Sequence, residues 1–219
     1  TWVTYGNSFL QIIRGEFEEA LLNIKDSSAL DPTPINIAHL NTIRGMANWQ
    51  LGREELAIKN LAETLPILNS LPPQVYSLLV SYQALARISF NAWEHGKTFD
   101  IPGWRSTDEI RKTISIVIKL LKKYKRAFLI GEPALLYYQG LLKWMDNKPE
   151  TAFKDWHASI QAARTLAMPW NEAHAWKLLG LRSEGEERKA NLEKALMLFT
   201  SCHAIYDIVE TKKALSENK

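Results

Sequence analysis

Residues 140–156 read GLLKWMDNKPETAFKDW, and residues 45–61 read GMANWQLGREELAIKNL. The two stretches lie far apart in the chain, yet they place Gly, Trp, Ala and a large apolar residue at the same offsets. Two packed helices need such a spacing, because a small residue on one helix leaves room for a large residue on the other. We therefore interpret the repeat as architecture. The corresponding residues are Gly45 and Gly140, Trp49 and Trp144, Ala57 and Ala152, and Leu61 and Trp156.

Helical periodicity extends over almost every long segment, and no long segment alternates apolar and polar residues as a half-buried strand does. Most prolines suit helix starts or connections. Pro66 is the exception, and we expect it to end or bend its helix. The spacing of Ser106 and Glu109 predicts a capping box. The sequence predicts eleven helices, over about 2–14, 16–29, 35–51, 53–69, 73–95, 106–125, 133–146, 149–167, 170–182, 186–201 and 203–217.

Short links between these helices favour antiparallel pairs. A glycine inside a helix costs about 1 kcal/mol relative to alanine, so the recurrence of Gly45 and Gly140 suggests a contact that offsets this cost. The prediction is an all-α protein, a right-handed α-solenoid in a single domain over 1–219. Its five hairpins cover about 2–31, 35–69, 73–126, 132–167 and 170–201, with a capping helix over 203–217. The structural repeat positions are Gly15, Ala20, Gly45, Ala57, Gly140, Ala152, Gly180 and Ala195. In the last pair we expect Gly180 to be followed by Ala195 and Phe199 after a slightly longer turn.

This pattern resembles the tetratricopeptide-repeat (TPR) family across nearly the whole chain. In the first pair, Ser8 and Gly15 hold the two small positions of that repeat and Phe17 holds its aromatic position. Ala20, Ile24 and Pro32 hold its Ala, large apolar and Pro positions. The chain departs from the family in lacking the early Trp in most repeats, and its repeat interval is often nearer about 40 residues than about 34. The resemblance implies a concave groove lined by the first helix of each pair.

A narrower resemblance covers roughly 127–215. This region resembles the C-terminal TPR-like part of multidomain signalling proteins, in which such repeats follow a STAND-type NTPase module, sometimes with a nucleotide cyclase or protein kinase domain. The matching features are Met168-Pro169, Ala173, Gly180, the LEKALMLF block at 192–199, and Ala204, Tyr206 and Asp207. The chain begins at Thr1 rather than Met, so we expect a fragment or processed form of a larger protein.

Composition favours an ordinary cytoplasmic protein. The chain is 46% hydrophobic and 23% charged, and its net charge of +3 gives no case for a nucleic-acid partner. The basic run from Lys119 to Arg126 suits the solvated end of a helix. The one cysteine, Cys202, fits a reducing compartment. No apolar run approaches the roughly 18 residues of a membrane span, so we expect no membrane partner.

Catalytic motifs are missing from the sequence. It contains no phosphate loop, no dinucleotide-binding turn and no nucleophile elbow. No two of the five histidines have the i, i+4 spacing of a zinc-binding helix. We predict that the chain is not an enzyme, and we expect no cofactor and no metal. An all-α enzyme is the remaining hypothesis, which requires His157 and His174 to converge with carboxylates in a cleft.

The aromatic residues are the candidate binding residues. On the concave face we expect Trp49, Phe90, Trp93, Tyr137, Trp144, His174 and Lys177 to contact a partner. Such side chains give much contact area at low entropic cost. The alternative is that they seal neighbouring helices against one another. The insertion at 96–105, with its apolar Phe99, Ile101 and Trp104, is expected either to pack back on its own domain or to form a contact point.

The predicted function is a non-catalytic protein–protein interaction and regulatory module of a signalling NTPase or cyclase. Its partner is a protein or peptide segment, or a neighbouring domain of the parent chain. The sequence leaves its oligomeric state open. The alternative function is a sensor of a small molecule or peptide that gates a linked NTPase. That alternative predicts a concave pocket near Trp93, Tyr137 and Trp144.

Overall fold

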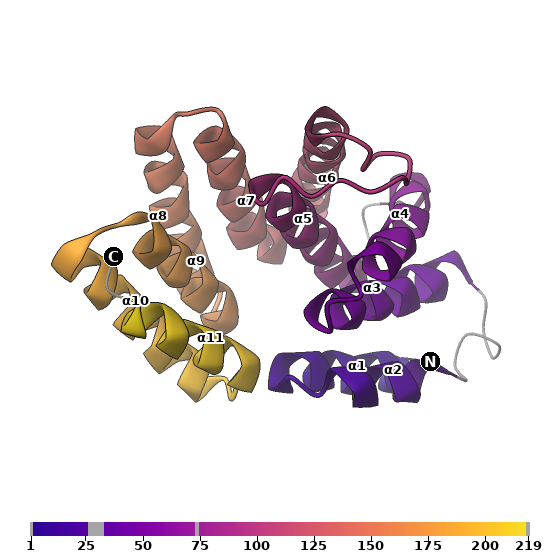
Figure 1. Ribbon diagram of the computed structural model, residues 1–219, viewed down its shortest axis with the longest axis horizontal. Helices are drawn as coiled ribbons and strands as arrows, with labels where there is room; N and C mark the ends of the chain where they lie inside the picture. Colours follow the sequence, from indigo (N-terminus) through magenta and orange to yellow (C-terminus); the bar gives the residue numbers. More distant parts are fainter. Residues whose placement is uncertain (1, 26–32, 73–74, 218–219) are drawn as a thin grey trace. The chain divides into compact units, whose positions relative to one another are not determined.

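The computed structural model describes residues 2–25, 33–72 and 75–217. Within these ranges all regular secondary structure is helical, with eleven α-helices, two short 3-10 helices and no strand (Figure 1). The predicted all-α class is therefore confirmed. Some of the predictions concern residues outside the described ranges. These are the predicted helical residues 26–29, the end of the first predicted hairpin, Pro32 and Pro73.

The helix ends agree with the predicted ones to within a few residues, except that the fifth α-helix begins six residues later than expected, after a 3-10 turn. The first helices are α1 (Trp2–Arg14), α2 (Phe17–Lys25), α3 (Pro34–Gln50), α4 (Glu54–Ser70), η2 (Tyr76–Leu78), α5 (Leu79–Glu94) and α6 (Thr107–Ala127). They are followed by η3 (Leu129–Gly131), α7 (Glu132–Met145), α8 (Pro149–Thr165), α9 (Pro169–Arg182), α10 (Gly185–Ser201) and α11 (Ile205–Ser216).

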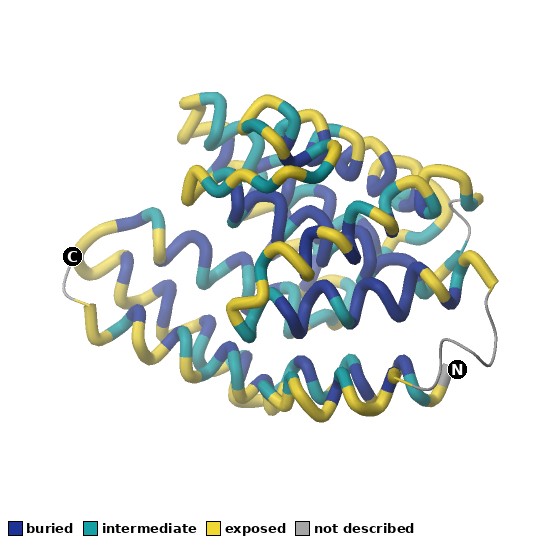
Figure 2. The backbone as a smooth tube through the Cα atoms, turned by 45° about the vertical axis from the view of Figure 1, so that its right-hand side comes forward, coloured by how far each residue is buried: buried dark blue, intermediate teal, exposed yellow. Residues whose placement is uncertain are grey.

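Contacts between the helices divide the chain into two compact units, unit 1 (Thr1–Phe128) and unit 2 (Leu129–Lys219). In unit 1 the neighbouring pairs are α1/α2, α3/α4 and α5/α6, and α3 also contacts α1, α2 and α5. In unit 2 the pairs are α7/α8 and α9/α10, with α8 against α9 and α10 against α11. Consecutive helices thus pair as the short links predicted, and buried residues recur along one side of the helices (Figure 2). The single-domain solenoid stays a prediction.

Glycines face large side chains inside three of these pairs. A Cβ at Gly45 would lie 2.8 Å from Leu61 Cγ, and one at Gly140 would lie 2.6 Å from Trp156 Cδ1. In the α9/α10 pair the facing residue of Gly180 is Leu192, 2.7 Å from the same hypothetical atom. We expected Ala195 and Phe199 there. Gly45 and Gly140 lie five residues before the ends of α3 and α7, whereas Gly180 lies two residues before the end of α9, and the link after α9 is one residue shorter. The facing residue is therefore 12 residues after Gly180, in place of 16 residues after the other two glycines.

The other repeat positions divide into two kinds. Ala20, Ala57, Ala152 and Ala195 are fully buried, as close packing of the helix pairs requires. Gly15 instead lies in the link between α1 and α2 with φ of 84°, a left-handed conformation that glycine adopts without strain.

Pro66 lies inside α4, which continues to Ser70. The expectation that Pro66 ends its helix was therefore wrong. The helix continues because the fixed φ of proline is itself helical, and the lost N–H removes only one backbone hydrogen bond.

The insertion at 96–105 packs back on unit 1. Trp104 is only 1% exposed, and Phe99 N–H donates to the Trp104 carbonyl oxygen over 2.8 Å. Ser106 caps α6 by accepting the Glu109 N–H at 3.1 Å, which confirms half of the predicted capping box. The Glu109 carboxylate does not return to Ser106 but accepts the N–H groups of Gly103 (2.8 Å) and Arg105 (3.2 Å), so it ties the insertion to the helix.

Candidate functional site

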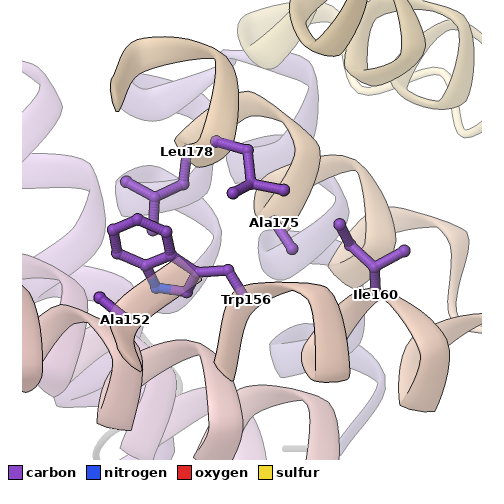
Figure 3. Packing of buried hydrophobic residues seen from close by; sticks show 6 residues of the cluster. Ala152, Trp156, Ile160, Ala175 and Leu178 are labelled. Atoms are coloured by element: carbon purple, nitrogen blue, oxygen red, sulfur yellow. The ribbon is translucent and has the colours of Figure 1, made fainter. Parts of the chain in front are cut away.

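A group of half-buried aromatic and apolar side chains surrounds the core of unit 2. The core beneath it contains Ala152, Trp156, Ile160, Ala175, Leu178 and Leu179 (Figure 3). We call the surrounding group the aromatic face; its members are Tyr137, Leu141 and Trp144 of α7, Phe153 of α8 and Trp176 of α9. Three helices therefore contribute half-buried apolar side chains that pack against one core.

Trp156 holds this face in place from below. Its side chain is fully buried, and its indole points towards Leu178 (Figure 3). The indole N–H donates to the carbonyl oxygen of Tyr137 over 3.2 Å, which satisfies the one polar atom of the ring. The bare Cα of Gly140 lets α7 approach closely enough for this bond. The backbone that carries the aromatic face is therefore fixed by a buried contact.

Trp144 combines an apolar ring with a neighbouring cation. Its ring centroid lies 5.8 Å from that of Trp156 and 6.2 Å from that of Phe153. The guanidinium carbon of Arg182, at the end of α9, lies 5.1 Å from the Trp144 centroid, in the range of a cation–π contact. One part of the ring thus packs on the core while the rest stays partly accessible beside a positive charge.

Trp176 is more fully engaged by its neighbours. Its indole N–H donates to a carboxylate oxygen of Glu172 at 3.2 Å, and Arg164 donates to the same oxygen at 2.6 Å. Lys194 of α10 lies 4.1 Å from the ring centroid, and the ring of His157 of α8 meets it edge-on at 6.3 Å. These contacts link α8, α9 and α10. They occupy more of the Trp176 ring than the neighbours of Trp144 occupy of its ring, so Trp144 is the better candidate for contact with a partner.

His174 lies in a different cluster, where α9 meets α10 and α11. Its ring contacts Trp170 at 4.3 Å and Phe199 at 5.0 Å, and its Nε2 lies 3.6 Å from the carboxylate of Asp207. The Trp170 indole N–H donates to the same carboxylate oxygen at 3.2 Å. Asp207 is 5% exposed. This cluster therefore joins α9 to α10 and α11. The remaining candidate binding residue of unit 2, Lys177, is half-buried on α9.

The all-α enzyme hypothesis required His157 and His174 to converge. They belong to separate clusters, His157 against Trp176 and His174 against Trp170. Within the described ranges, no three His, Cys, Asp or Glu side chains are grouped as a metal ion requires. The chain's lack of enzymatic activity stays a prediction.

The three candidate residues of unit 1 lie in three different settings. Trp49 is half-buried at the end of α3, with the ammonium of Lys97 5.6 Å from its ring centroid. Lys97 also forms an ion pair with Glu54, and this pair connects the insertion at 96–105 to α4. Phe90 of α5 is 6% exposed, which leaves little of it for a partner to touch. Trp93 is half-buried.

Several residues of the aromatic face were not among the predicted binding residues. Phe153, Trp176 and Arg182 come from three helices, and single-helix periodicity does not show that they meet Trp144. A signal was available for Arg182, since it lies in the last turn of its helix after Gly180, as Trp144 lies in the last turn of its helix after Gly140.

Two surface hollows lie in unit 1. One, of about 590 Å³, is lined by Gly52, Arg53, Glu54, Glu55, Leu56, Lys59 and Ile101. The other, of about 540 Å³, is lined by Asp108, Arg111, Lys112, Ser115, Ile116 and Lys119. Neither hollow is lined by Trp93, Tyr137 or Trp144, the residues that the small-molecule alternative places around its pocket.

Comparison of the chain with protein-family models, with curated proteins and with solved structures finds no match. Among the described residues, no helix has the length and apolar character needed to cross a bilayer.

Proposed function

We propose that this chain is a non-catalytic interaction module built of TPR-like helical hairpins, and that the aromatic face of unit 2 binds a polypeptide segment. One observation carries the proposal: Trp144 presents a half-buried ring beside the guanidinium of Arg182, on a backbone fixed by Trp156. Interfaces concentrate their binding energy in Trp, Tyr and Arg side chains, and such side chains are most effective when their positions are fixed before binding.

The charges around the face favour an apolar anchor with a neighbouring carboxylate. The guanidinium carbon of Arg182 lies 5.1 Å from the Trp144 centroid, and Lys143 of α7 lies 2.6 Å from the Asp155 carboxylate. The positive charge of a guanidinium attracts a carboxylate. A partner side chain lying on Tyr137 and Leu141 would place its neighbouring acidic group close to Arg182.

The wider proposal is a single α-solenoid of the TPR type with five hairpins. The glycine contacts of Gly45 with Leu61 and of Gly140 with Trp156 support it, because the same packing device recurs in units 1 and 2. A cytoplasmic regulatory role beside a signalling NTPase or cyclase rests on the resemblance of residues 127–215. In that role the partner is a neighbouring domain of the parent chain.

Affinity capture tests this proposal with a matched pair of variants. Trp144→Ala removes the proposed anchor, while Trp49→Ala removes a half-buried Trp with a cation over its ring in unit 1. We expect Trp144→Ala to lose a partner that the wild type and Trp49→Ala both retain. Equal retention or equal loss by the two variants, with helical content unchanged, would contradict the proposal. A rise in melting temperature with a metabolite and no protein partner would favour the sensor alternative.

A further inference from the structure

The outer side of α6 is strongly basic. Between Glu109 and Glu132 the sequence has seven cations and no carboxylate, and without them the net charge of the chain would change from +3 to −4. The opposite side of the helix is the buried one, with Ile110, Ile114, Val117 and Leu121 fully buried. The helix therefore separates an apolar buried side from a cationic exposed side.

Five exposed residues form one straight row along this side, which we call the basic stripe: Lys112, Ile116, Lys119, Lys123 and Arg126. Their spacing of four, three, four and three residues keeps them on one side of a helix. At 1.5 Å per residue the row is about 21 Å long. Ile116, 38% exposed, is its one apolar member and lines the hollow of about 540 Å³ together with Lys112 and Lys119.

The helix end does not explain this row. Cations favour the last turn of a helix, but that effect fades within one turn. Arg126 lies in that turn, whereas Lys112 and Lys119 lie far from the end of α6 at Ala127. Pairs such as Lys119 and Lys123 are like charges four residues apart, which destabilises a helix. Repulsion between the cations of the stripe therefore destabilises α6 locally, and a bound anionic group would remove this repulsion.

The four cations of the stripe form no ion pair among the described residues, although Asp108, one turn before Lys112, lines the same hollow. Some exposed cations elsewhere are paired, such as Arg53 with Glu18 and Arg164 with Glu172, whereas others, such as Lys154 and Lys189, form no ion pair within the described ranges. The stripe is therefore distinguished by the close spacing of four unpaired cations on one side of a single helix, which an acidic segment could neutralise together.

From this geometry we infer that the basic stripe of α6 binds an acidic polypeptide segment whose carboxylates flank one apolar side chain. The carboxylates would pair with Lys112, Lys119, Lys123 and Arg126, while the apolar side chain would lie on Ile116. A segment of about 15 residues covers the stripe if it is helical. This site lies in unit 1 and is separate from the aromatic face.

The side chains favour a polypeptide over the two other polyanions. A helix that binds a lipid surface turns its apolar side to the membrane, but the apolar side of α6 is buried in unit 1. Single-stranded nucleic acid is bound through aromatic side chains on which bases stack, and the stripe has none.

The test measures binding of a synthetic helical peptide of about 15 residues, with Glu at the same four–three spacing and one central Leu. The stripe variant combines Lys112→Glu, Lys119→Glu, Lys123→Glu and Arg126→Glu. The matched control variant combines Lys154→Glu, Lys189→Glu, Lys212→Glu and Lys213→Glu, four exposed lysines of unit 2. Both variants change the net charge equally, and both are checked for helical content.

We expect the wild type and the control variant to bind the peptide, and the stripe variant to bind at least about tenfold more weakly, since several ion pairs are lost together. Binding should also weaken between about 50 mM and about 300 mM salt. Ile116→Ser should weaken binding of the Leu peptide but not of its Leu→Ala version. Trp144→Ala should leave this binding unchanged, which separates the stripe from the aromatic face.

Three results would overturn the inference. The first is equal binding of a peptide with Gln in place of every Glu. The second is equal loss in the stripe and control variants. The third is tighter binding of anionic vesicles or of a single-stranded oligonucleotide than of the peptide. If the stripe variant loses helical content, the milder pair Lys119→Gln and Lys123→Gln takes its place, with the same expected direction.

Discussion

The indole N–H of Trp156 donates a hydrogen bond to the carbonyl oxygen of Tyr137, 3.2 Å away, across the point where Gly140 has no side chain. Tyr137 is three residues before Gly140 on the same helix, so one indole both fills the space at the glycine and binds the backbone next to it. This relationship explains why a poor helix former stands inside α7. It also connects a fully buried side chain of unit 2 to the surface that we propose as its binding site.

Gly140→Ala should destabilise the protein. A Cβ at this position would lie 2.6 Å from Trp156 Cδ1 and 3.1 Å from the backbone oxygen of Ala152, so the indole or the helix must shift. We expect a loss of about 1–3 kcal/mol in the free energy of unfolding, measured by chemical denaturation. Gly6→Ala is the control, since nothing lies within 4 Å of its added Cβ. There the gain in helix propensity should stabilise by about 0.5–1 kcal/mol. Equal effects of the two substitutions would contradict the packing role of Gly140.

The repeat could be predicted from the sequence because it depends on local spacing. Gly45 and Leu61, like Gly140 and Trp156, are separated by one link of standard length, and the same offset recurs. Gly180 shows the limit of this reasoning. Its facing residue is Leu192 rather than Ala195 or Phe199, because Gly180 lies nearer the end of its helix than Gly45 and Gly140 do, and because the link after α9 is shorter rather than longer. A repeat frame of constant length cannot follow that change.

Trp156→Ala and Trp144→Ala should differ in their effect on stability. Trp156 is fully buried, so its truncation should cost about 3–5 kcal/mol of the free energy of unfolding. Trp144 is half-buried, and we expect a clearly smaller loss because part of its ring is already in contact with water. Chemical denaturation of both variants measures the difference. Equal losses would mean that Trp144 is a core residue, and they would remove the basis of the aromatic face as a binding surface.

Stability should depend on pH through His39. This side chain is 1% exposed and stacks on Tyr5 at 4.2 Å. Burial lowers the pKa of His39 from 6.5 to about 4, against a smaller opposing effect of a hydrogen bond with the backbone of Ser77. The unfolded chain therefore binds a proton at higher pH than the folded chain does. The stabilising contribution is present above pH 6.5 and is lost as the pH falls towards 4, roughly 3 kcal/mol in total.

His39→Gln separates this contribution from the titration of other groups. The variant keeps a polar side chain that does not titrate, so its free energy of unfolding should fall less steeply than that of the wild type between pH 6.5 and 4. Parallel curves for the wild type and His39→Gln would show that His39 makes no such contribution.

The cap of α6 should be worth about 1 kcal/mol. Ser106→Ala removes the hydroxyl that accepts the Glu109 N–H, and loss of such a cap costs about 0.5–2 kcal/mol. Glu109→Gln should also destabilise, because its carboxylate accepts the N–H groups of both Gly103 and Arg105, and a neutral amide is a weaker acceptor. Thermal unfolding measures both variants. Since Glu109 holds the insertion, only its variant should speed proteolysis within residues 96–105.

The candidate site was less predictable than the fold for a physical reason. Helical periodicity depends on neighbours three and four residues apart, whereas the aromatic face depends on contacts such as Arg182 with Trp144, far apart in the sequence. The predicted residues also separate in the structure: Trp144 belongs to the aromatic face, and His174 belongs to the junction with α11. Position on a repeat frame indicates which helix carries a residue, but not which neighbours bury it.

Trp170→Phe should loosen the last helix. The indole N–H of Trp170 donates to the buried carboxylate of Asp207 at 3.2 Å, and phenylalanine keeps the ring contact with His174 but removes the donor. A buried acceptor that loses its partner costs about 1–3 kcal/mol. Hydrogen exchange should therefore become faster in α11 while α7 and α8 keep their protection. Trp176→Phe is the control on the same helix, since it removes an indole donor to Glu172, which still accepts from Arg164. Faster exchange of α11 in both variants, or in neither, would show that the bond to Asp207 does not hold this helix.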